Sequence, residues 1–411
     1  MTFGRYTAAD GATVHPLAYD PTTGDRPAEF GPQTVSQPAD DRLRVLHITP
    51  YIIAGGVESW IRTLARAQQG RVRHAVVAPW AGESGLDMME GVVDLYLPET
   101  NIDPYSAPAL KWLGAFLRHR PEFDILHCTY HKGLYEVALA DGRPRIVTVH
   151  SDGYRWLHEV KSPDRTVIIS DWQGAMLPEW IRGPKREKIV NGIEVEGFAK
   201  PSGWAGYKEA YRSSFTYPRR DGQEPVVALW VGRLHKTKGL ETLRAIAERW
   251  LPGAPNRHLA IVGQAHDEAV NVQMRKWMGQ VERVSWIEYI EPEQMPWAYA
   301  AADIYLHTAP CEGFGLTVAE AQASGLPVVA LEAPGVNEIV VHGETGSLSP
   351  LGGAEVDRLV GSLDYLAGDK RLRRRMGRAG QKRARELFTA ERMGNEYLEL
   401  YRWVASHSRG A

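Results

Sequence analysis

The length, composition and charge of the chain exclude several classes of protein. At roughly 150 residues per domain, 411 residues make two or three domains, and a hydrophobic content of 44% is enough for sizeable cores. Lys and Arg total 48 against 50 for Asp and Glu, and a net charge of −2 excludes a protein that wraps nucleic acid. Two cysteines, Cys128 and Cys311, exclude a disulfide framework and a four-cysteine zinc site, so we expect a reducing, cytoplasmic compartment.

Membrane segments are not expected either. The start of the chain lacks the apolar core of a signal peptide, and no uninterrupted apolar stretch approaches the roughly eighteen residues of a membrane span. One amphipathic stretch, 107–118, combines Trp112 and Phe116 with Lys111 and Arg118. Because the chain has no net positive charge, core packing of this helix is favoured over contact with a membrane surface. We predict no transmembrane segment and no peripheral membrane contact.

The first half alternates short apolar runs with helix-length amphipathic stretches. Before this pattern, residues 1–40 have no periodicity and are expected to form a flexible extension or one draped on the body. From residue 41 the alternation is typical of parallel strand–helix–strand units. Strands are predicted at 44–48, 74–78, 92–97, 124–128, 145–149 and 166–170, and helices at 57–69, 107–118 and 132–140.

The alternation pauses between Gly192 and Glu224 and then restarts, which indicates a domain boundary. We place one Rossmann-like domain at 41–200 and a second at 201–388. Two doubly wound α/β domains in tandem direct the carboxyl ends of their strands toward a shared interdomain cleft, where such sheets bind ligands. Strands of the second domain are predicted at 226–231, 258–262, 284–288, 304–306 and 328–331, with a terminal amphipathic helix at 389–404.

A basic turn follows the first strand of the second half. The sequence GRLHKTKG, 232–239, puts Arg233 and Lys238 between the carboxyl end of a strand and the start of a helix. Backbone N–H groups and the helix dipole attract an anion there, Arg offers a planar fork to phosphate oxygens, and Lys adds a point charge. A solvated basic loop is the alternative that the turn alone leaves open.

Two carboxylates bracket a second glycine turn. Glu312 precedes Gly-Phe-Gly, and Glu320 lies two turns into the helix that follows. Glycines let backbone amides approach a ligand anion, and carboxylates accept hydrogen bonds from the vicinal hydroxyls of a sugar or a ribose. An ordinary acidic helix face is the alternative, above all for Glu320 taken alone.

These two segments, GRLHKTKG and EGFGLTVAEAQASGLPVV (312–329), closely resemble the donor-binding half of retaining GT-B glycosyltransferases of the large family GT4. The resemblance covers most of residues 42–405. It includes the sequences GGVE at 55–58, NGIE at 191–194 and FTAERMGNEYLELY at 388–401. It implies the GT-B fold, in which the last helix, here 389–411, crosses back to the N-terminal, acceptor-binding domain.

Carried over position by position, the resemblance implies a role for each residue of the predicted donor site. Arg233 and Lys238 bind the donor diphosphate and neutralise the leaving group. Glu320 accepts hydrogen bonds from the ribose, and Glu312 accepts them from hydroxyls of the transferred sugar. The residues expected near the nucleotide base are Tyr289 and Ile290, and those expected to hold sugar or phosphate are Gly313, Phe314, Gly315, Leu316 and Thr317.

The first half contributes a glycine pair and a histidine. Gly55 and Gly56 link a predicted strand to a helix, which is typical of close approach by a ligand, and we assign them to the donor site; simple turn geometry is the alternative. The absence of G-x-G-x-x-G argues against a nicotinamide cofactor. His150 ends the strand 145–149, and the resemblance places a functional histidine there, beside donor sugar and acceptor. The predicted catalytic residues are Arg233, Lys238, His150 and Glu312.

Acceptor contacts are predicted after two strands of the first half, from Tyr130, His131, His150, Asp152 and Tyr154. His127, Cys128 and His131 lie within five residues, but a strand-to-loop transition separates their side chains and no second cluster completes a ligand set. We therefore predict no metal site. No Asp-x-Asp occurs, which agrees with charge neutralisation by Arg233 and Lys238.

The sequence thus predicts a glycosyltransferase that needs neither a cofactor nor a metal ion, and the resemblance implies that it retains the anomeric configuration. Its donor is a nucleotide diphosphate sugar, expected to be a UDP-sugar, and its acceptor a hydroxyl of a small molecule such as a sugar phosphate or an antibiotic precursor. Three alternatives stay open: a nucleotide-sugar epimerase, a synthase that couples a cyclitol, and a non-catalytic nucleotide-sugar binding protein. A homodimer stays open as well.

Overall fold

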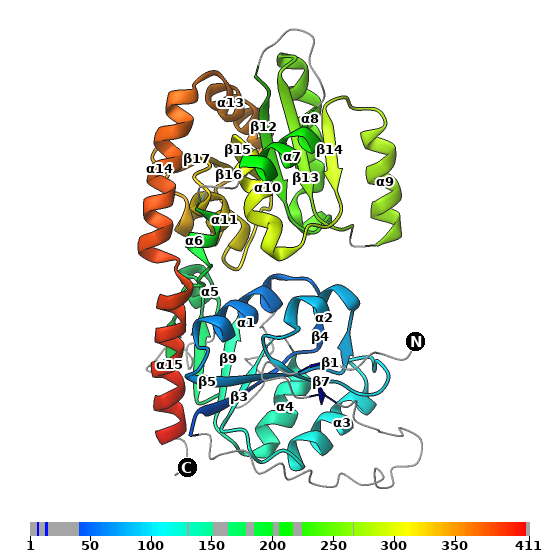
Figure 1. Cartoon of the computed structure of the whole chain (residues 1–411), viewed down its shortest axis with the longest axis vertical. Coiled ribbons are helices and arrows are strands. Elements are labelled where there is room, and N and C mark those ends of the chain that lie inside the picture. Colours follow the sequence, from blue (N-terminus) through cyan, green and yellow to red (C-terminus); the bar gives the residue numbers. More distant parts are fainter. Residues whose placement is uncertain are drawn as a thin grey trace. The chain divides into compact units, whose positions relative to one another are not determined.

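The computed structural model describes residues 6–7, 13–14, 41–129, 131–150, 163–177, 185–199, 205–216, 224–265 and 267–407. The chain divides into two units, each with its own parallel sheet. The first unit comprises Met1–Gly192 together with Ala390–Ala411, and the second comprises Ile193–Thr389. Figure 1 shows the elements of both in colours that follow the sequence.

A seven-stranded sheet forms the centre of the first unit. Its strand order is β11-β10-β9-β8-β3-β5-β7, and every adjacent pair is parallel. The bounds are β3 Leu43–Ile48, β5 Val72–Val77, β7 Asp94–Tyr96, β8 Ile125–Cys128, β9 Arg145–Val149, β10 Arg165–Ile168 and β11 Arg186–Lys188. Short strands pair outside this sheet: β1 Tyr6–Thr7 with β2 Thr13–Val14, and β4 Tyr51–Ile52 with β6 Trp80–Ala81.

Helices cover both faces of this sheet, because its strands are apolar on both sides. Side chains alternate along β3, so Val45 joins one core and Leu46 the other. Residues of α1, α2 and α15 complete the core around Val45, and residues of α3 and α4 complete the core around Leu46. The helices are α1 Gly56–Ala67, α2 Glu83–Met89, α3 Ala107–Arg118, α4 Lys132–Asp141, α5 Asp171–Met176 and α15 Ala390–His407.

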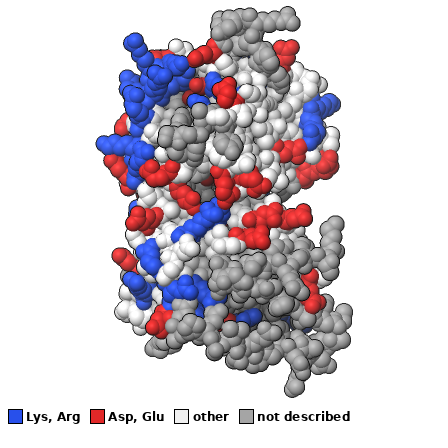
Figure 2. Space-filling model, in the orientation of Figure 1, with Lys and Arg blue, Asp and Glu red and all other residues white. Residues whose placement is uncertain are grey.

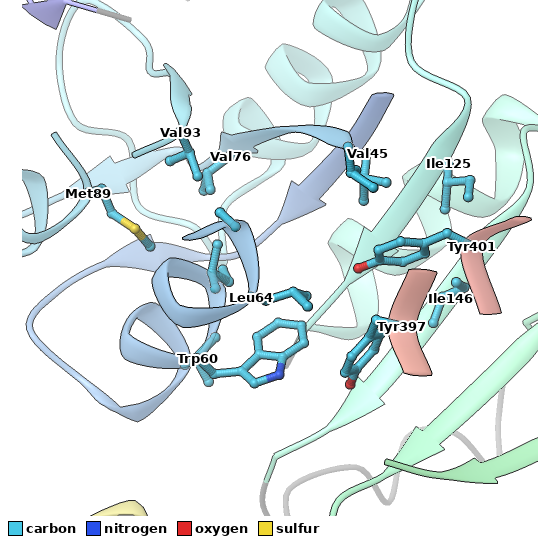
Figure 3. Close-up of a cluster of buried hydrophobic side chains, with 14 of the residues drawn as sticks. Val45, Trp60, Leu64, Val76, Met89, Val93, Ile125, Ile146, Tyr397 and Tyr401 are labelled. Carbon is cyan, nitrogen blue, oxygen red and sulfur yellow. The ribbon is translucent and has the colours of Figure 1, made fainter. Parts of the chain in front are cut away.

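The last helix, α15, belongs to the core of the first unit. Its residues Tyr397 and Tyr401 are fully buried, and Figure 3 shows their rings beside Trp60 of α1 and Val45 of β3. The ring centroids of Trp60 and Tyr397 are 5.5 Å apart in an edge-on arrangement that aromatic pairs favour. The chain therefore returns to its first unit after completing the second, as the resemblance implied.

A six-stranded parallel sheet of order β14-β13-β12-β15-β16-β17 forms the centre of the second unit. Its strands are β12 Val226–Val231, β13 Arg257–Val262, β14 Val284–Ile287, β15 Ile304–His307, β16 Val328–Leu331 and β17 Gly346–Ser349. The helices are α6 Val195–Phe198, α7 Ala205–Phe215, α8 Leu240–Trp250, α9 Glu268–Met278, α10 Met295–Ala301, α11 Leu316–Ala323, α12 Val336–Ile339, α13 Glu355–Gly368 and α14 Lys370–Leu387. Short 3₁₀ turns are η3 Lys236–Lys238, η4 Leu251–Gly253 and η5 Pro292–Gln294.

Positive charge gathers on α14, which has nine Lys and Arg and one Glu in eighteen residues. Two of its arginines turn inward: Arg373 donates to the carbonyl oxygens of Leu366 and Ala367, and Arg383 donates to that of Ile339. These carbonyls end α13 and α12, so the guanidinium groups satisfy acceptors that a helix end leaves unpaired. The other seven cations are exposed, and Figure 2 shows blue side chains gathered along this helix.

The predicted fold class, two tandem Rossmann-like α/β domains, is confirmed, with local differences. The chain enters the second unit after Gly192 rather than after residue 200, because α6 packs on α10 and α11. The stretch without a strand pattern contains α6 and α7, and the short polar edge strands β11 and β17 were not predicted. Most of the expected extension, 1–40, lies outside the described residues. Among the described helices, none is long and apolar enough to cross a membrane.

Candidate functional site

The carboxyl ends of β12 and β15 bring the two predicted motifs of the second unit to one sheet edge. These strands are parallel neighbours in register, with Ala228 opposite Ile304 and Leu229 opposite Tyr305. Strand β12 leads into the basic turn 232–239, and β15 leads into the loop that carries Glu312. Because parallel strands end at the same edge, the turn and the loop are adjacent, as ligand sites of such sheets require.

The basic turn packs closely against the residue that follows β15. Gly239, between η3 and α8, has a φ of +71°, and a Cβ there would collide with the carbonyl oxygen of Thr308. The Thr308 hydroxyl donates to the carbonyl oxygen of Lys238 at 2.8 Å and accepts from the indole N–H of Trp230 at 2.9 Å. The backbone of Lys238 is therefore fixed, while the side chain of Arg233 at the start of the turn is exposed.

Lys238 and Glu312 form an ion pair. Lys238 Nζ lies 2.6 Å from Glu312 Oε1, and the two side chains are 32% and 15% exposed. The two motifs of the sequence thus meet in one contact, with part of each charge open to a ligand. Lysine and carboxylate neutralise each other here, so an incoming anion must compete with Glu312 for the ammonium group.

His307, the last residue of β15, is a neighbour of this pair that sequence reasoning missed. Its side chain is 4% exposed, and its Nε2 lies 3.6 Å from Glu312 Oε1. Burial lowers the pKa of His307 to about 4; the Glu312 carboxylate opposes this shift and Lys238 adds to it. The imidazole is therefore neutral at neutral pH. In the sequence, His307 lies within an apolar strand and resembles a residue of the hydrophobic core. Only its position five residues before Glu312 indicated that it could belong to the site.

The glycine turn is shaped by close backbone approach. Gly315, which precedes α11, has a φ of +104°, and Gly335 has a φ of +81° with its Cβ position only 2.5 Å from the carbonyl oxygen of Glu312. The Phe314 ring is buried edge-on against Phe388, so it anchors the turn instead of facing a ligand. The first amides of α11, including those of Leu316 and Thr317, have no partner within the helix and are available to an anion.

Glu320 lies on α11, and its side chain is partly exposed. The hydroxyl of Tyr299, a fully buried residue of α10, donates to Glu320 Oε2 at 2.7 Å. Burial raises the pKa of Glu320 to about 7, against the opposing effect of the Tyr299 hydrogen bond. Around neutral pH this carboxyl group is therefore divided between its acid and its carboxylate form.

The residues predicted near a nucleotide base follow the edge strand β14. That strand is separated from β12 by β13, which places Tyr289 and Ile290 about 10 Å along the sheet from the basic turn. Tyr289 is 36% exposed and its hydroxyl donates to Glu291, whereas Ile290 is buried. Of the two side chains, that of Tyr289 is therefore the more accessible one.

In the first unit, a carboxylate occupies the predicted glycine loop. Gly55 and Gly56 open α1, and Gly55 has extended backbone angles rather than a positive φ. The buried Glu58 accepts from the amide of Ile53 at 3.4 Å, and a Cβ at Gly55 would lie 2.8 Å from Glu58 Oε2. The glycines thus make room for Glu58.

His150, which is partly exposed, adjoins a layer of buried histidines. Its ring meets Trp60 at 4.6 Å between centroids, and burial lowers its pKa to about 3. Three more histidines come from neighbouring strands: His127 of β8 lies opposite His47 of β3, and His47 Nε2 lies 2.9 Å from His74 Nδ1. The pKa values of His47 and His127 are well below the usual value because burial disfavours the charged form.

This histidine layer is hydrogen-bonded to α15. His127 Nδ1 lies 2.8 Å from the hydroxyl of Tyr401, and its Nε2 lies 2.7 Å from the hydroxyl of Thr148, which is 3.0 Å from that of Tyr397. His74 Nε2 lies 2.7 Å from Gln68 Oε1. Sequence reasoning assigned a functional role to His150 and considered His127 only as a metal ligand. Predicting the layer would have required the register of the strands, which the sequence alone does not provide.

The other predicted acceptor residues are only partly described. His131 begins α4, and its Nδ1 accepts from the amide of Leu134 at 3.1 Å, so one ring nitrogen serves as a helix cap. Tyr130, Asp152 and Tyr154 lie outside the described residues. Within the described ranges, no group of three or more His, Cys, Asp or Glu side chains is arranged to hold a metal ion.

Two family models match the chain in succession. Residues 54–196 match "Glycosyltransferase Family 4", and residues 218–383 match "Glycosyl transferases group 1". The second range includes every predicted donor residue of the second unit, from Arg233 to Glu320. The chain belongs to this glycosyltransferase family.

Individual relatives agree with this membership. The chain is 35% identical over 165 residues to the D-inositol 3-phosphate glycosyltransferase of Corynebacterium diphtheriae, a match that covers 38% of each chain. It is 30% identical over 224 residues to the GDP-mannose-dependent alpha-(1-6)-phosphatidylinositol monomannoside mannosyltransferase of Mycolicibacterium smegmatis, covering 52% of this chain and 55% of that protein. The matched stretches thus span about half or less of these relatives.

A solved structure supports the fold over a longer range. Anabaena HepE, in complex with UDP and glucose, superposes with a TM-score of 0.71 at 16% identity, covering 88% of this chain and 100% of that one. At this identity the likeness concerns the fold alone. It agrees with the two tandem sheets of this glycosyltransferase-family chain.

Proposed function

We propose that this chain transfers a sugar from a nucleotide diphosphate sugar to a hydroxyl group of a small acceptor. The observation that carries the proposal is the contact between Lys238 and Glu312 at the carboxyl ends of β12 and β15, with Lys238 Nζ 2.6 Å from Glu312 Oε1 and Arg233 exposed at the start of the same turn as Lys238. Two cations can neutralise the charge of a departing diphosphate, and a carboxylate can accept hydrogen bonds from the hydroxyls of a sugar.

Charge on the leaving group is the main chemical demand. Glycosyl transfer passes through an oxocarbenium-like state while the diphosphate departs. Lys238 is held by its backbone, so only its side chain has to turn from Glu312 to the diphosphate. Arg233 is exposed at the start of the same turn and adds a planar fork of donors.

Glu320 and Tyr289 are proposed to hold the nucleoside. A carboxylate at Glu320 accepts hydrogen bonds from ribose hydroxyls, and the Tyr299 hydroxyl at 2.7 Å orients it. With a pKa raised to about 7 by burial, Glu320 gains acceptor strength as pH rises through neutrality. We keep a UDP-sugar as the proposed donor, with a GDP-sugar as the alternative that the mannosyltransferase relative favours.

The acceptor is proposed to be a phosphorylated polyol. The relative from Corynebacterium diphtheriae is named for D-inositol 3-phosphate, which is such a molecule. This acceptor also agrees with the small sugar phosphate that the sequence led us to expect. We propose retention of configuration with no metal ion, the departing phosphate helping to take the acceptor proton. In this mechanism His150, whose pKa is lowered by burial so that the ring is neutral, positions the donor sugar and the acceptor and is not the main base.

The test is a thermal-shift panel followed by a turnover assay. UDP-glucose, GDP-mannose, ADP-glucose and TDP-glucose are compared, and the proposal expects one of them to stabilise the protein by binding the folded state. That donor is then incubated with and without D-inositol 3-phosphate, and released nucleotide and product mass are measured. Release that depends on acceptor supports transfer. Conversion of the donor alone would indicate an epimerase, and binding without turnover a non-catalytic protein.

A further inference from the structure

His307 is a buried polar side chain with one buried, unpaired ring nitrogen. It ends β15, is 3% exposed, and its Nε2 has no hydrogen-bond partner among the described residues. Glu312 Oε1 is an acceptor 3.6 Å from this nitrogen, just beyond hydrogen-bond distance. Buried polar groups are normally paired, so an unpaired donor aimed at a carboxylate calls for a functional explanation.

The end of β15 controls both members of the ion pair. Thr308, the next residue, bonds the backbone of Lys238, while the imidazole of His307 lies beside the carboxylate of Glu312. Successive side chains of an extended segment point to opposite sides, which explains how one strand end serves two partners. The His307 ring is also stacked on Tyr305, 6.3 Å between centroids and 28° apart in plane.

We propose that His307 is a positioning residue that holds Glu312 in place when Lys238 turns to the donor diphosphate. This inference rests on the proposed function. In the structure, Lys238 is the hydrogen-bond donor to Glu312 Oε1. Once a diphosphate draws that ammonium group away, Glu312 Oε1 loses this donor, and the N–H of His307 Nε2, 3.6 Å away, can take its place. A shift of about 0.7 Å closes the gap to a normal bond length.

A neutral imidazole suits this exchange. Burial holds the pKa of His307 at about 4, so at neutral pH the ring has one N–H to give and no positive charge. It therefore orients Glu312 toward sugar hydroxyls without neutralising the carboxylate.

The experiment compares three variants by calorimetry. His307→Leu removes the donor and keeps an apolar core residue. His307→Gln places an amide N–H near the position of Nε2, whereas His307→Asn places it near Nδ1, too short to reach Glu312. Each protein is titrated with UDP-glucose and UDP, and with GDP-mannose and GDP. The nucleotide alone is the internal control, because Glu312 is assigned to the sugar.

The proposal expects His307→Leu to weaken binding of the nucleotide sugar about tenfold, the scale of one lost hydrogen bond to a charged group, and to leave the nucleotide affinity within about twofold. His307→Gln restores sugar-nucleotide affinity and His307→Asn does not. Equal losses for nucleotide and nucleotide sugar, or equal affinities of the Gln and Asn variants, would overturn it. A wild-type protein that binds neither UDP-glucose nor GDP-mannose would instead contradict the proposed function, and this inference with it.

Discussion

The two units each contain a buried or half-buried polar cluster, and the clusters differ in charge. In the first unit, His47, His74 and His127 share hydrogen bonds with one another or with Thr148, Gln68 and Tyr401, and Thr148 is hydrogen-bonded in turn to Tyr397; all of these are uncharged groups. In the second unit, Lys238 and Glu312 form an ion pair at the edge of the sheet. One cluster connects structural elements, and the other is available to exchange partners with a ligand.

Solvent access explains the difference. His47, His74 and His127 are buried away from water, and burial lowers the pKa values of His74 and of the neighbouring His150 to about 3, so these two rings stay neutral. Lys238 is 32% exposed, which keeps its charge hydrated and reachable. A neutral network stabilises the docking of α15 on the first unit, whereas a charged pair at an open edge is suited to bind an anion.

The largest expected effect concerns the charged cluster. Arg233→Ala should lower turnover roughly 10²- to 10³-fold, because a cation that faces the developing charge of the leaving group is lost. The measurement is kcat with the donor that the thermal-shift panel selects. Arg249→Ala removes an arginine that pairs with Asp357 on the surface of the same unit and should retain wild-type turnover. Similar activity of both variants would refute the assignment of Arg233.

A backbone contact should matter nearly as much as the charges. Gly239→Ala adds a Cβ against the carbonyl oxygen of Thr308 at a positive φ, so we expect a loss of about 3 kcal/mol or more in the free energy of unfolding and weaker donor binding. Gly343 has nearly the same φ, +79°, with open space around it. Gly343→Ala should therefore cost only about 1 to 2 kcal/mol. Denaturant unfolding of both variants checks the contrast.

Glu320 should make the second unit less stable as pH rises. Its pKa is about 7 in the folded chain and 4.5 when unperturbed, so between these values the unfolded chain loses a proton that the folded chain keeps. Stability present below pH 4.5 is therefore lost as pH rises through 7, by at most about 3 kcal/mol. Glu320→Gln, without this loss, should melt higher than wild type at pH 8 but not at pH 4.5. Glu344→Gln, at an exposed site, should follow wild type.

The histidine layer should show the opposite dependence on pH. The pKa of His74 is about 3 in the folded chain and 6.5 when unperturbed. As pH falls below 6.5, the unfolded chain therefore binds a proton that the folded chain does not bind. Each such histidine costs about 1.4 kcal/mol of stability at pH 5.5. Between pH 7.5 and 5.5 the melting temperature of His74→Gln should fall less than that of the wild type, and we expect the two drops to differ by about 2 to 4 °C. His119→Gln, at an exposed position, is the control; an equal drop for His74→Gln and wild type would count against neutral burial.

The charged cluster was more accessible to sequence reasoning than the neutral one. Arg233 and Lys238 follow one strand, Glu312 and Glu320 follow another, and glycines mark both turns, so local pattern alone places these residues at strand ends. His307 escaped notice because a histidine inside an apolar strand resembles core. Its importance depends on the 3.6 Å approach to a carboxylate five residues away, across a turn whose shape depends on Gly335.

The histidine layer shows the same limit in the first unit. His47, His74, His127 and His150 are spread over more than one hundred residues, and they meet only because β5, β3, β8 and β9 are adjacent in that order. The glycine pair is the reverse case. Gly55 and Gly56 suggested space for a ligand, but the side chain of Glu58 folds back into that space.

The amino-acid sequence by itself determined the fold class, the positions of most strands and the motifs at their ends, because alternation, glycine turns and clustered charges are local properties of the chain. Tertiary structure alone decided which motifs meet, which protonation states prevail and where α15 docks. Those properties depend on strand order, on distances of a few ångströms and on exclusion of water, and all three arise only when segments distant in sequence are packed together.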